Sequence, residues 1–314
     1  MGGFSRREFL LSAAAFGATY LLPSSALEGE LDPSHNVFVV GDLHLTNSDG
    51  VEKKAAVIVS ALKTLAGGKT GFHLIFNGDF LEFPNLAKTA KNAAWQWEQF
   101  AKLLIPLKEA GFIPHLVFGN HDGEVSFGKD VLRGVIPQEL IGDSSFEVAE
   151  NRFILIGGIH PSELDYGFLD SELTAARGKR IIVATHYPPD KLTYLTDKFG
   201  EKVGYNLWAK PEIIQRIAKT NASIVSSHAH SPFAGSYDSC SLGRKIDVLA
   251  TPSVTYTLPY LRTEFKPPRV SGITLLNLKD PVGRAKFYDG KKAFRPSRIR
   301  VDARKGRFVP LPIK

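Results

Sequence analysis

The sequence predicts an α/β fold, because short apolar segments alternate along the chain with amphipathic segments of helical periodicity. The apolar segments are three or four residues long and rich in branched or aromatic side chains, which is typical of strands buried on both faces of a sheet. Polar residues that commonly bind metals follow five of the six segments directly. These observations together predict a functional site at the carboxyl ends of the strands.

The individual elements follow from this alternation. Strands are expected at 37–40, 73–76, 115–118, 153–156, 181–184 and 223–225. Helices are expected at 51–66, 91–110, 168–177 and 210–219, where apolar side chains recur at helical spacing. After residue 230 the helical pattern fades, and further strands are expected at 245–249, 272–278 and 284–288. We find no internal repeat, and no linker within 27–283, so this segment is expected to form one domain.

Composition narrows the class of protein. The chain has 314 residues, 43% of them hydrophobic and 23% charged, which is enough apolar content for a core and excludes a disordered protein. A single cysteine, Cys240, excludes an intrachain disulfide and a thiolate-rich metal site. No apolar stretch reaches about 18 residues, so no conventional membrane span is expected. Any metal must therefore be held by His, Asp, Glu or Asn.

Residues 1–26 have the pattern of an export signal. Arg6 and Arg7 precede a mildly apolar segment, 9–22, and small residues follow it. The sequence SRREFL around the two arginines resembles the twin-arginine signal. This resemblance implies export in a folded state to the periplasm or another extracytoplasmic compartment. A short amphipathic N-terminal helix is the alternative.

Basic residues are concentrated at the C-terminus. Residues 284–314 hold eleven Lys or Arg and two Asp, a net charge of +9, against +7 for the whole chain. This excess could attract nucleic acid or another anionic polymer. Aromatic residues are sparse there and no binding module is recognisable, so we favour a solvated basic tail or edge strand. The predicted organisation is a signal peptide (1–26), one domain (27–283) and this C-terminal segment.

Five polar motifs follow the predicted strands. They are Asp42-Leu43-His44, Gly78-Asp79, Gly119-Asn120-His121-Asp122, His186 and His228-Ala229-His230. Residues two apart in an extended chain face the same way, so Asp42 can point with His44, and His228 with His230. Adjacent residues diverge, so of Asn120 and His121 one can bind metal while the other faces substrate.

The ligand types indicate which metals fit. Carboxylate and amide oxygens mixed with imidazole suit Mn, Fe or Zn better than Ca or Cu(I). Seven candidate ligands are too many for one tetrahedral ion, whereas two ions sharing a carboxylate would use them all. The remaining histidines that we considered, His35, His73, His115 and His160, are expected to be structural, although His160 could border the site.

Taken in order, the five motifs resemble those of the calcineurin-like metallophosphoesterase family, over roughly residues 36–280. The resemblance implies a four-layer sandwich in which two mixed β-sheets are flanked by helices. It also implies two divalent or mixed-valence ions, with Asp79 bridging them. One ion would be held by Asp42, His44 and His230, and the other by Asn120, His186 and His228. Ser227 departs from the family, which usually has Gly there, and predicts a perturbed loop with the metals retained.

The same resemblance implies a two-metal phosphoester hydrolase. A water or hydroxide between the ions would attack phosphorus in line, with no covalent enzyme intermediate. His121 would assist the leaving group, with Asp122 orienting its ring. Glu82 and Tyr187 are weaker candidates for substrate binding. Glu82 could instead support a metal ligand, and Tyr187 could simply pack.

The substrate is indicated by two differing resemblances. The segments 185–189, 250–255 and 272–276 resemble the class III cyclic-nucleotide phosphodiesterase branch. The segment 78–82 instead resembles UDP-diacylglucosamine pyrophosphohydrolases, which usually have Arg where this chain has His121. We therefore expect a phosphodiesterase of small phosphoesters, with phosphomonoesters as a further substrate class. The alternatives are a UDP-sugar-type pyrophosphohydrolase, a nuclease, or an exported anion-binding protein without activity.

Overall fold

The computed structural model describes most of the segment in which the motifs lie. It covers residues 31–45, 51–82, 90–122, 125–158, 160, 163–188, 195–196, 202–203, 211–228, 230, 233–239, 244–253, 272–281, 285–288, 293–294, 297–302 and 307–310. The predicted export signal, 1–26, lies outside the described residues. Within them, no helix combines the length and the hydropathy needed to cross a membrane.

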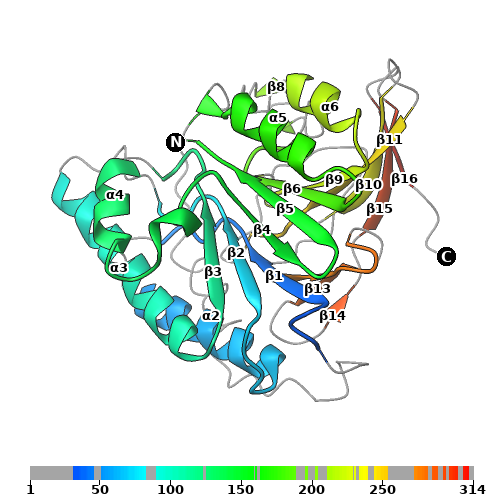
Figure 1. The fold of residues 1–314 in the computed structure, drawn as a ribbon. Helices are drawn as coiled ribbons and strands as arrows, with labels where there is room; N and C mark the ends of the chain where they lie inside the picture. Colours follow the sequence, from blue (N-terminus) through cyan, green and yellow to red (C-terminus); the bar gives the residue numbers. More distant parts are fainter. Residues whose placement is uncertain are drawn as a thin grey trace.

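Two large mixed sheets form the centre of the fold (Figure 1). The strands of the first are β1 (Asn36–Val40), β2 (His73–Asn77), β3 (Ile113–Val117), β12 (Ile273–Asn277), β13 (Lys286–Tyr288) and β14 (Ala293–Phe294). Their order is β14-β13-β12-β1-β2-β3. β1, β2 and β3 are parallel, and β12 runs antiparallel to β1.

The second sheet has eight strands. They are β4 (Ser144–Val148), β5 (Asn151–Ile156), β6 (Arg180–Thr185), β9 (Ala222–Ser226), β10 (Phe233–Ser239), β11 (Arg244–Ala250), β15 (Ser297–Asp302) and β16 (Arg307–Pro310). Their order is β16-β15-β10-β11-β9-β6-β5-β4, with β5, β6, β9 and β11 parallel. A small separate sheet pairs β7 (Leu195–Thr196) with β8 (Lys202–Val203).

Helices cover the outer face of each large sheet. The first sheet is covered by α2 (Val51–Ala66) and α3 (Ala90–Glu109), with α4 (Val125–Leu132) packed against α3. A short 3₁₀ helix, η2 (Gln138–Leu140), follows α4. The second sheet is covered by α5 (Tyr166–Ala175) and α6 (Pro211–Ile217) (Figure 1). The expected four-layer α/β sandwich is therefore confirmed.

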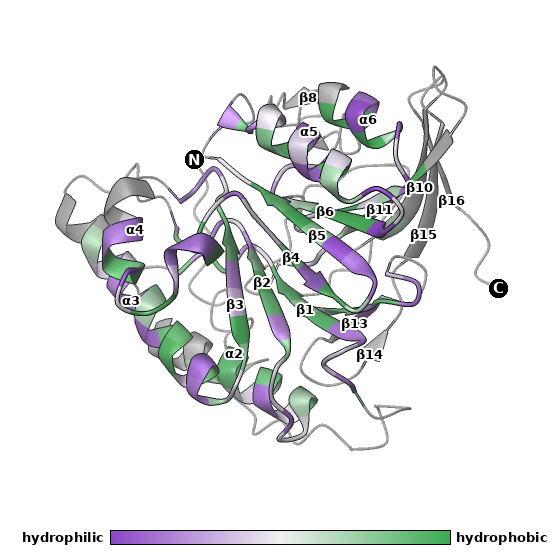
Figure 2. Ribbon diagram, viewed as in Figure 1, coloured by the Kyte–Doolittle hydropathy of each residue, from purple (hydrophilic) through white to green (hydrophobic). Residues whose placement is uncertain are grey.

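The central strands are largely hydrophobic along their length (Figure 2), because both of their faces meet another layer. In β1, Phe38 and Val40 pack toward the helices, whereas Val37 and Val39 pack between the sheets. β5 alternates in the same way, with Phe153 between the sheets. This alternation explains why the sequence shows continuous apolar segments rather than the alternating pattern of a half-exposed sheet.

A stack of four rings crosses between the two sheets, formed by His73, His115, Phe146 and Phe153. The Phe146 ring centroid lies 4.6 Å from that of His73, 3.8 Å from that of His115 and 4.8 Å from that of Phe153. His73 Nδ1 and His115 Nε2 are 2.8 Å apart. We call this group the ring stack; it confirms the structural role expected for both histidines.

The predicted elements before residue 230 are all present, with small shifts in their bounds. The sequence missed β4, which has the sequence SSFEV, and β10, which has the sequence FAGSYDS, because neither contains an apolar run. It also missed the short helix α4. Beyond residue 284, strands β13 and β14 extend the first sheet, and β15 and β16 extend the second.

Candidate metal centre

The polar motifs gather at the carboxyl ends of the parallel strands. Two groups of side chains offer ligand atoms that all lie within 4.8 Å of one another. The first group is Asp42, His44, Asp79 and His230, and the second is Asp79, His186 and His228. Asp79 belongs to both groups, which is the position that the family resemblance implied for a bridging residue.

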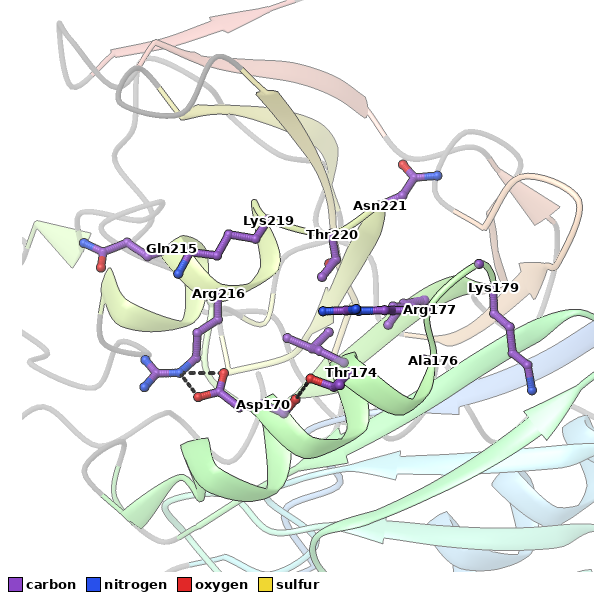
Figure 3. Close-up of a pocket in the computed structure, with 13 residues that line it drawn as sticks. Asp170, Thr174, Ala176, Arg177, Lys179, Gln215, Arg216, Lys219, Thr220 and Asn221 are labelled. Carbon is purple, nitrogen blue, oxygen red and sulfur yellow. Dashed lines mark hydrogen bonds and ion pairs between the residues drawn. The ribbon is translucent and has the colours of Figure 1, made fainter.

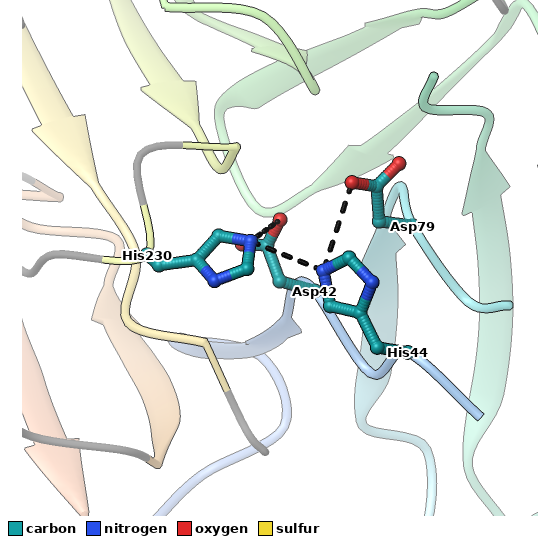
Figure 4. A group of neighbouring side chains, drawn as sticks. All are labelled: Asp42, His44, Asp79 and His230. Carbon is teal, nitrogen blue, oxygen red and sulfur yellow. Dashed lines mark hydrogen bonds and ion pairs between the residues drawn. The ribbon is translucent and has the colours of Figure 1, made fainter. Parts of the chain in front are cut away.

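The first group is compact and almost completely buried (Figure 4). His44 Nε2 lies 3.1 Å from His230 Nε2 and 3.7 Å from Asp79 Oδ2. His230 Nε2 lies 3.3 Å from Asp42 Oδ1. Two carboxylates and two imidazoles thus direct lone-pair atoms toward one small volume.

The second group lies on the other side of Asp79. His186 Nε2 is 3.3 Å from Asp79 Oδ1 and 3.1 Å from Asn120 Oδ1. The His228 ring centroid is 5.1 Å from that of His186. The two oxygens of Asp79 therefore face different groups, Oδ2 toward His44 and Oδ1 toward His186. This is the geometry that a carboxylate needs to bind two cations at once.

The ligands converge through an unusual backbone conformation. Of six described non-glycine residues with positive φ, five are candidate ligands. They are Asp42 (52°), His44 (46°), Asp79 (54°), His228 (62°) and His230 (51°). The extended chain expected for the two Asp/His-x-His motifs is therefore wrong, because left-handed backbone, rather than strand geometry, directs both members inward. Such conformations persist where the surrounding fold enforces them, and they cluster at functional sites.

Gly78 permits the close approach of two motifs. Its φ is 83°, and a Cβ at this position would lie 2.3 Å from His186 Nδ1. Because Gly78 has no side chain, the His186 ring can lie against the backbone at the end of β2. Its Nδ1 is there 2.9 Å from the carbonyl oxygen of Asn77. Any other residue at 78 would displace the imidazole.

Asp122 has a different role from the one expected. Its carboxylate accepts hydrogen bonds from the backbone N–H groups of Gly119, Asp79, Phe80 and Leu81, at 2.7–3.3 Å. These contacts fix the loop that carries Asp79, and they leave no described contact between Asp122 and the His121 ring. We therefore assign Asp122 to holding the loops. Burial, followed by the Asp79 charge, raises the pKa of Asp122 to about 8.

His121 lies beside the cluster and at its opening. Its Nε2 is 3.9 Å from Asp79 Oδ2, and its ring meets the His44 ring edge-on at 4.8 Å. The side chain is 18% exposed, against 1% for His44. Burial lowers the pKa of His121, so the imidazole is neutral at neutral pH. Its neighbour Asn120 points to His186 instead, so the two adjacent side chains diverge as expected.

The two weaker candidates for substrate binding, Glu82 and Tyr187, each contact a candidate ligand. Glu82 Oε2 is 3.2 Å from His44 Nδ1, on the side of the ring away from the other ligands. Tyr187 is fully buried; its hydroxyl donates to the Gly158 carbonyl at 2.9 Å, and its ring packs edge-on against His186. Glu82 therefore lies against the outer nitrogen of a candidate ligand, and Tyr187 is packed in the interior beside His186.

The sequence did not identify a buried polar network below the site. Asn77 Nδ2 donates to the Thr185 carbonyl at 3.1 Å and to Ser227 Oγ at 2.9 Å, and Ser227 Oγ lies 2.8 Å from Thr251 Oγ1. A Cβ on Gly41 would lie 2.3 Å from Ser227 Oγ. Ser227 thus fits because residue 41 is glycine, and its hydroxyl links three strand ends.

The electrostatics of the cluster suit cations. Burial opposes ionisation of Asp42 and Asp79, but the neighbouring histidines outweigh it and lower the pKa of both carboxyl groups. Burial, then the charge of His186, lowers the pKa of His228 to about 3, which keeps that imidazole neutral. Buried carboxylates need compensating positive charge. Oxygen and imidazole donors on both sides of a shared carboxylate fit a pair of Mn, Fe or Zn ions.

A separate cavity, lined by described residues, lies away from the metal centre (Figure 3). It has a volume of about 870 Å³ and is bordered by the ends of α5 and α6 and the starts of β6 and β9. Its lining is basic, with Arg177, Lys179 and Lys219, and Arg216 pairs with Asp170 at 3.0 Å. Because this cavity lies at the opposite strand ends and its lining holds no histidine, we place the chemistry at the metal centre.

Comparisons with known proteins identify a family and similar folds for this chain. A model of the calcineurin-like phosphoesterase family matches residues 35–254. A search of curated protein sequences found no match.

Two solved structures are similar in fold. The purple acid phosphatase PPD1 from yellow lupin (Lupinus luteus) seeds superposes with a TM-score of 0.53 at 13% identity, covering 84% of this chain. This chain spans about half of that enzyme, 54% of its length. The protein TT1561 of Thermus thermophilus has a TM-score of 0.50 and 11% identity, covering 82% of this chain and 99% of that one. At these identities the likeness shows the fold alone.

The family match includes all seven candidate ligands and His121. The four-layer sandwich, the shared carboxylate and this match lead to one conclusion: the chain belongs to the calcineurin-like phosphoesterase family.

Proposed function

We propose that the chain is an exported dinuclear metal phosphoesterase that hydrolyses phosphodiester bonds and, as a second activity, phosphomonoester bonds. The observation that carries the proposal is the position of Asp79, whose two oxygens face separate groups of oxygen and nitrogen ligands. Two cations held by these groups would lower the pKa of a water molecule and neutralise charge on phosphoryl oxygens. Side chains of this chain would transfer the proton and hold the ligands in place.

His121 supplies the proton chemistry at the opening. Its side chain reaches solvent, whereas that of His44 is buried, and its ring lies over the His44 edge. A neutral imidazole at this position can hydrogen-bond to a phosphoryl or leaving-group oxygen through its N–H. The fraction of His121 that is protonated, which grows as the pH falls, can donate the proton that a leaving alkoxide needs. The other imidazoles point inward and orient the centre.

The buried surroundings keep this arrangement fixed. Asp122 holds the Asp79 loop through three backbone hydrogen bonds, and Asn77 holds His186 through its carbonyl oxygen. Preorganised groups in a site shielded from water stabilise developing charge more strongly than the same groups in water. A phosphoester bound at the opening therefore meets ligands that need no rearrangement.

The preference for diesters is supported by segments 185–189, 250–255 and 272–276, whose sequences resemble cyclic-nucleotide phosphodiesterases. The test compares hydrolysis of bis-p-nitrophenyl phosphate and p-nitrophenyl phosphate by the mature protein with Mn(II), and again with chelator. We expect turnover of both, faster for the diester, and loss of both with chelator. No turnover of either ester by metal-loaded protein would favour an anion-binding protein.

Export by the twin-arginine route is the second part of the proposal. It is supported by the SRREFL sequence and the apolar segment that follows. The test replaces Arg6 and Arg7 together by lysine, which keeps the charge. We expect the variant to remain in the cytoplasm as folded, metal-loaded protein, whereas the unchanged chain reaches the periplasm. Equal export of both would contradict the route.

A further inference from the structure

The two ring nitrogens of His44 have separate partners. Its Nε2 faces the cluster, 3.1 Å from His230 Nε2 and 3.7 Å from Asp79 Oδ2. Its Nδ1 faces away from the cluster and lies 3.2 Å from Glu82 Oε2. His44 is thus held between the other ligands and one outer carboxylate.

The backbone sets this carboxylate in place. Segments 42–45 and 78–82 run side by side: the N–H groups of His44 and Leu45 donate to the carbonyls of Asp79 and Phe80, both at 2.9 Å. The N–H of Glu82 donates back to the Leu45 carbonyl at 3.0 Å, and Gln96 Nε2 donates to the Glu82 carbonyl at 3.1 Å. Glu82 is therefore anchored on both sides of its Cα, directly opposite the His44 ring.

Tautomer chemistry gives this contact a consequence. A neutral imidazole carries one N–H, and only its other nitrogen can offer a lone pair to a cation. An acceptor at Nδ1 fixes the proton there, directs the ring and makes Nε2 a stronger ligand. Glu82 is 19% exposed at its side chain, so solvent screens the interaction only in part.

His186 shows the same arrangement with a different acceptor. Its Nδ1 faces the Asn77 carbonyl oxygen at 2.9 Å, and its Nε2 faces Asp79 and Asn120. The acceptor behind His186 is neutral and belongs to the backbone, whereas the acceptor behind His44 is a charged side chain. Only the acceptor behind His44, the Glu82 carboxylate, can be removed by substituting a side chain.

We propose that Glu82 is a positioning residue for His44, whose carboxylate holds the Nδ1–H and thereby strengthens the metal site formed with Asp42 and His230. The inference rests on the proposed dinuclear site. Glu82 adds a third negative charge near this half of the centre, so the first group binds its cation more tightly than the second.

The test titrates the full chain, depleted of metal, with Mn(II) in a calorimeter. Unchanged protein should show two binding steps. Asp42→Asn should weaken the step of the first group, and Asn120→Ala the step of the second, which assigns each step to its group. Glu82→Ala should weaken the Asp42 step about 10- to 100-fold and leave the other step unchanged. Glu82→Gln, which keeps an oxygen acceptor without charge, should recover part of the loss.

The control is Glu172→Gln. Glu172 lies on α5, outside the metal centre, and its carboxylate forms an ion pair with Arg152 at 2.6 Å. The control should leave both steps unchanged, and the thermal unfolding of the metal-free protein should match between Glu82→Ala and Glu82→Gln. Two steps of unchanged affinity in Glu82→Ala would overturn the inference alone. Absence of both steps in the unchanged protein would overturn the dinuclear site and the inference together.

Discussion

Buried or half-buried histidines occur in two regions of this molecule with opposite surroundings. His73 and His115 lie in β2 and β3 within the ring stack, where burial lowers their pKa values to about 4 and about 3. His44 and His186 lie beyond the ends of β1 and β6. Burial also disfavours their charged forms, but nearby carboxylates outweigh it, raise the pKa of His44 and bring that of His186 to about 9.

The difference shows that burial alone does not make a histidine functional. Both regions hide imidazoles from water, and in both an imidazole nitrogen lies near a second imidazole, at 2.8 Å in the ring stack and 3.1 Å between His44 and His230. Only the second region shares its volume with Asp42 and Asp79. The carboxylates therefore decide which histidines can attract a cation.

Removing the shared carboxylate should have the largest effect. In Asp79→Ala both groups lose a ligand, so we expect the protein to retain neither metal and its diesterase activity to fall by more than about 10⁴-fold. Elemental analysis and bis-p-nitrophenyl phosphate hydrolysis measure the two losses. Asp79→Asn, which keeps the shape of the side chain, serves as the control for misfolding. Full activity in either variant would refute the bridging role.

Removing His121 should separate catalysis from metal binding. His121→Ala should keep both metals and lose about 10²- to 10⁴-fold in kcat. The loss should be smaller for a p-nitrophenyl ester than for an alkyl ester, because p-nitrophenolate leaves with little need of a proton. Loss of metal, or equal losses for the two esters, would contradict a proton donor.

The ring stack should make stability depend on pH. Its histidines are neutral when folded but take up protons near pH 6.5 when unfolded, so stability should fall as pH drops from about 6.5 toward 4. His115→Phe keeps a ring against Phe146 and should flatten part of this fall. Urea unfolding at pH 7 and pH 5 measures it, with His160→Gln as the control. An equal fall in variant and parent would contradict the assignment.

The polar network below the metal centre should give the smallest effect. Ser227→Gly removes the hydroxyl that Asn77 donates to, and should cost about 1 kcal/mol of the free energy of unfolding. Both metals should stay bound, since the backbone contact from His228 N–H to Asp42 at 3.1 Å remains. Denaturant titration and metal analysis test this. Loss of a metal would mean that Ser227 positions the ligands directly.

The fold was predictable where buried strands contain continuous runs of apolar residues. The strands β1, β2, β5, β6 and β9 are apolar on both faces, and most of their ends are marked by polar motifs. β4 left no trace because its sequence, SSFEV, contributes few apolar side chains. The strand order within each sheet depends on contacts between distant segments, and no local pattern encodes it.

The site was predictable as a set of ligands but not as a geometry. Asp122 bonds to backbone N–H groups, which have no identity in a sequence, so its role in holding the loops could not be read. Glu82 could be named only as an alternative, because its contact with His44 depends on how segments 42–45 and 78–82 pair. The left-handed conformations at non-glycine ligands have no sequence signal.

Those left-handed ligands set stability against function. Each such residue costs on the order of 1–3 kcal/mol of conformational energy, which glycine largely avoids. A glycine at Asp42, His44, Asp79, His228 or His230 would thus relax the backbone while deleting a ligand. A screen that selected only for thermal stability of the metal-free chain would therefore favour such glycines. The resulting protein would be more stable and would have lost its metal ligands.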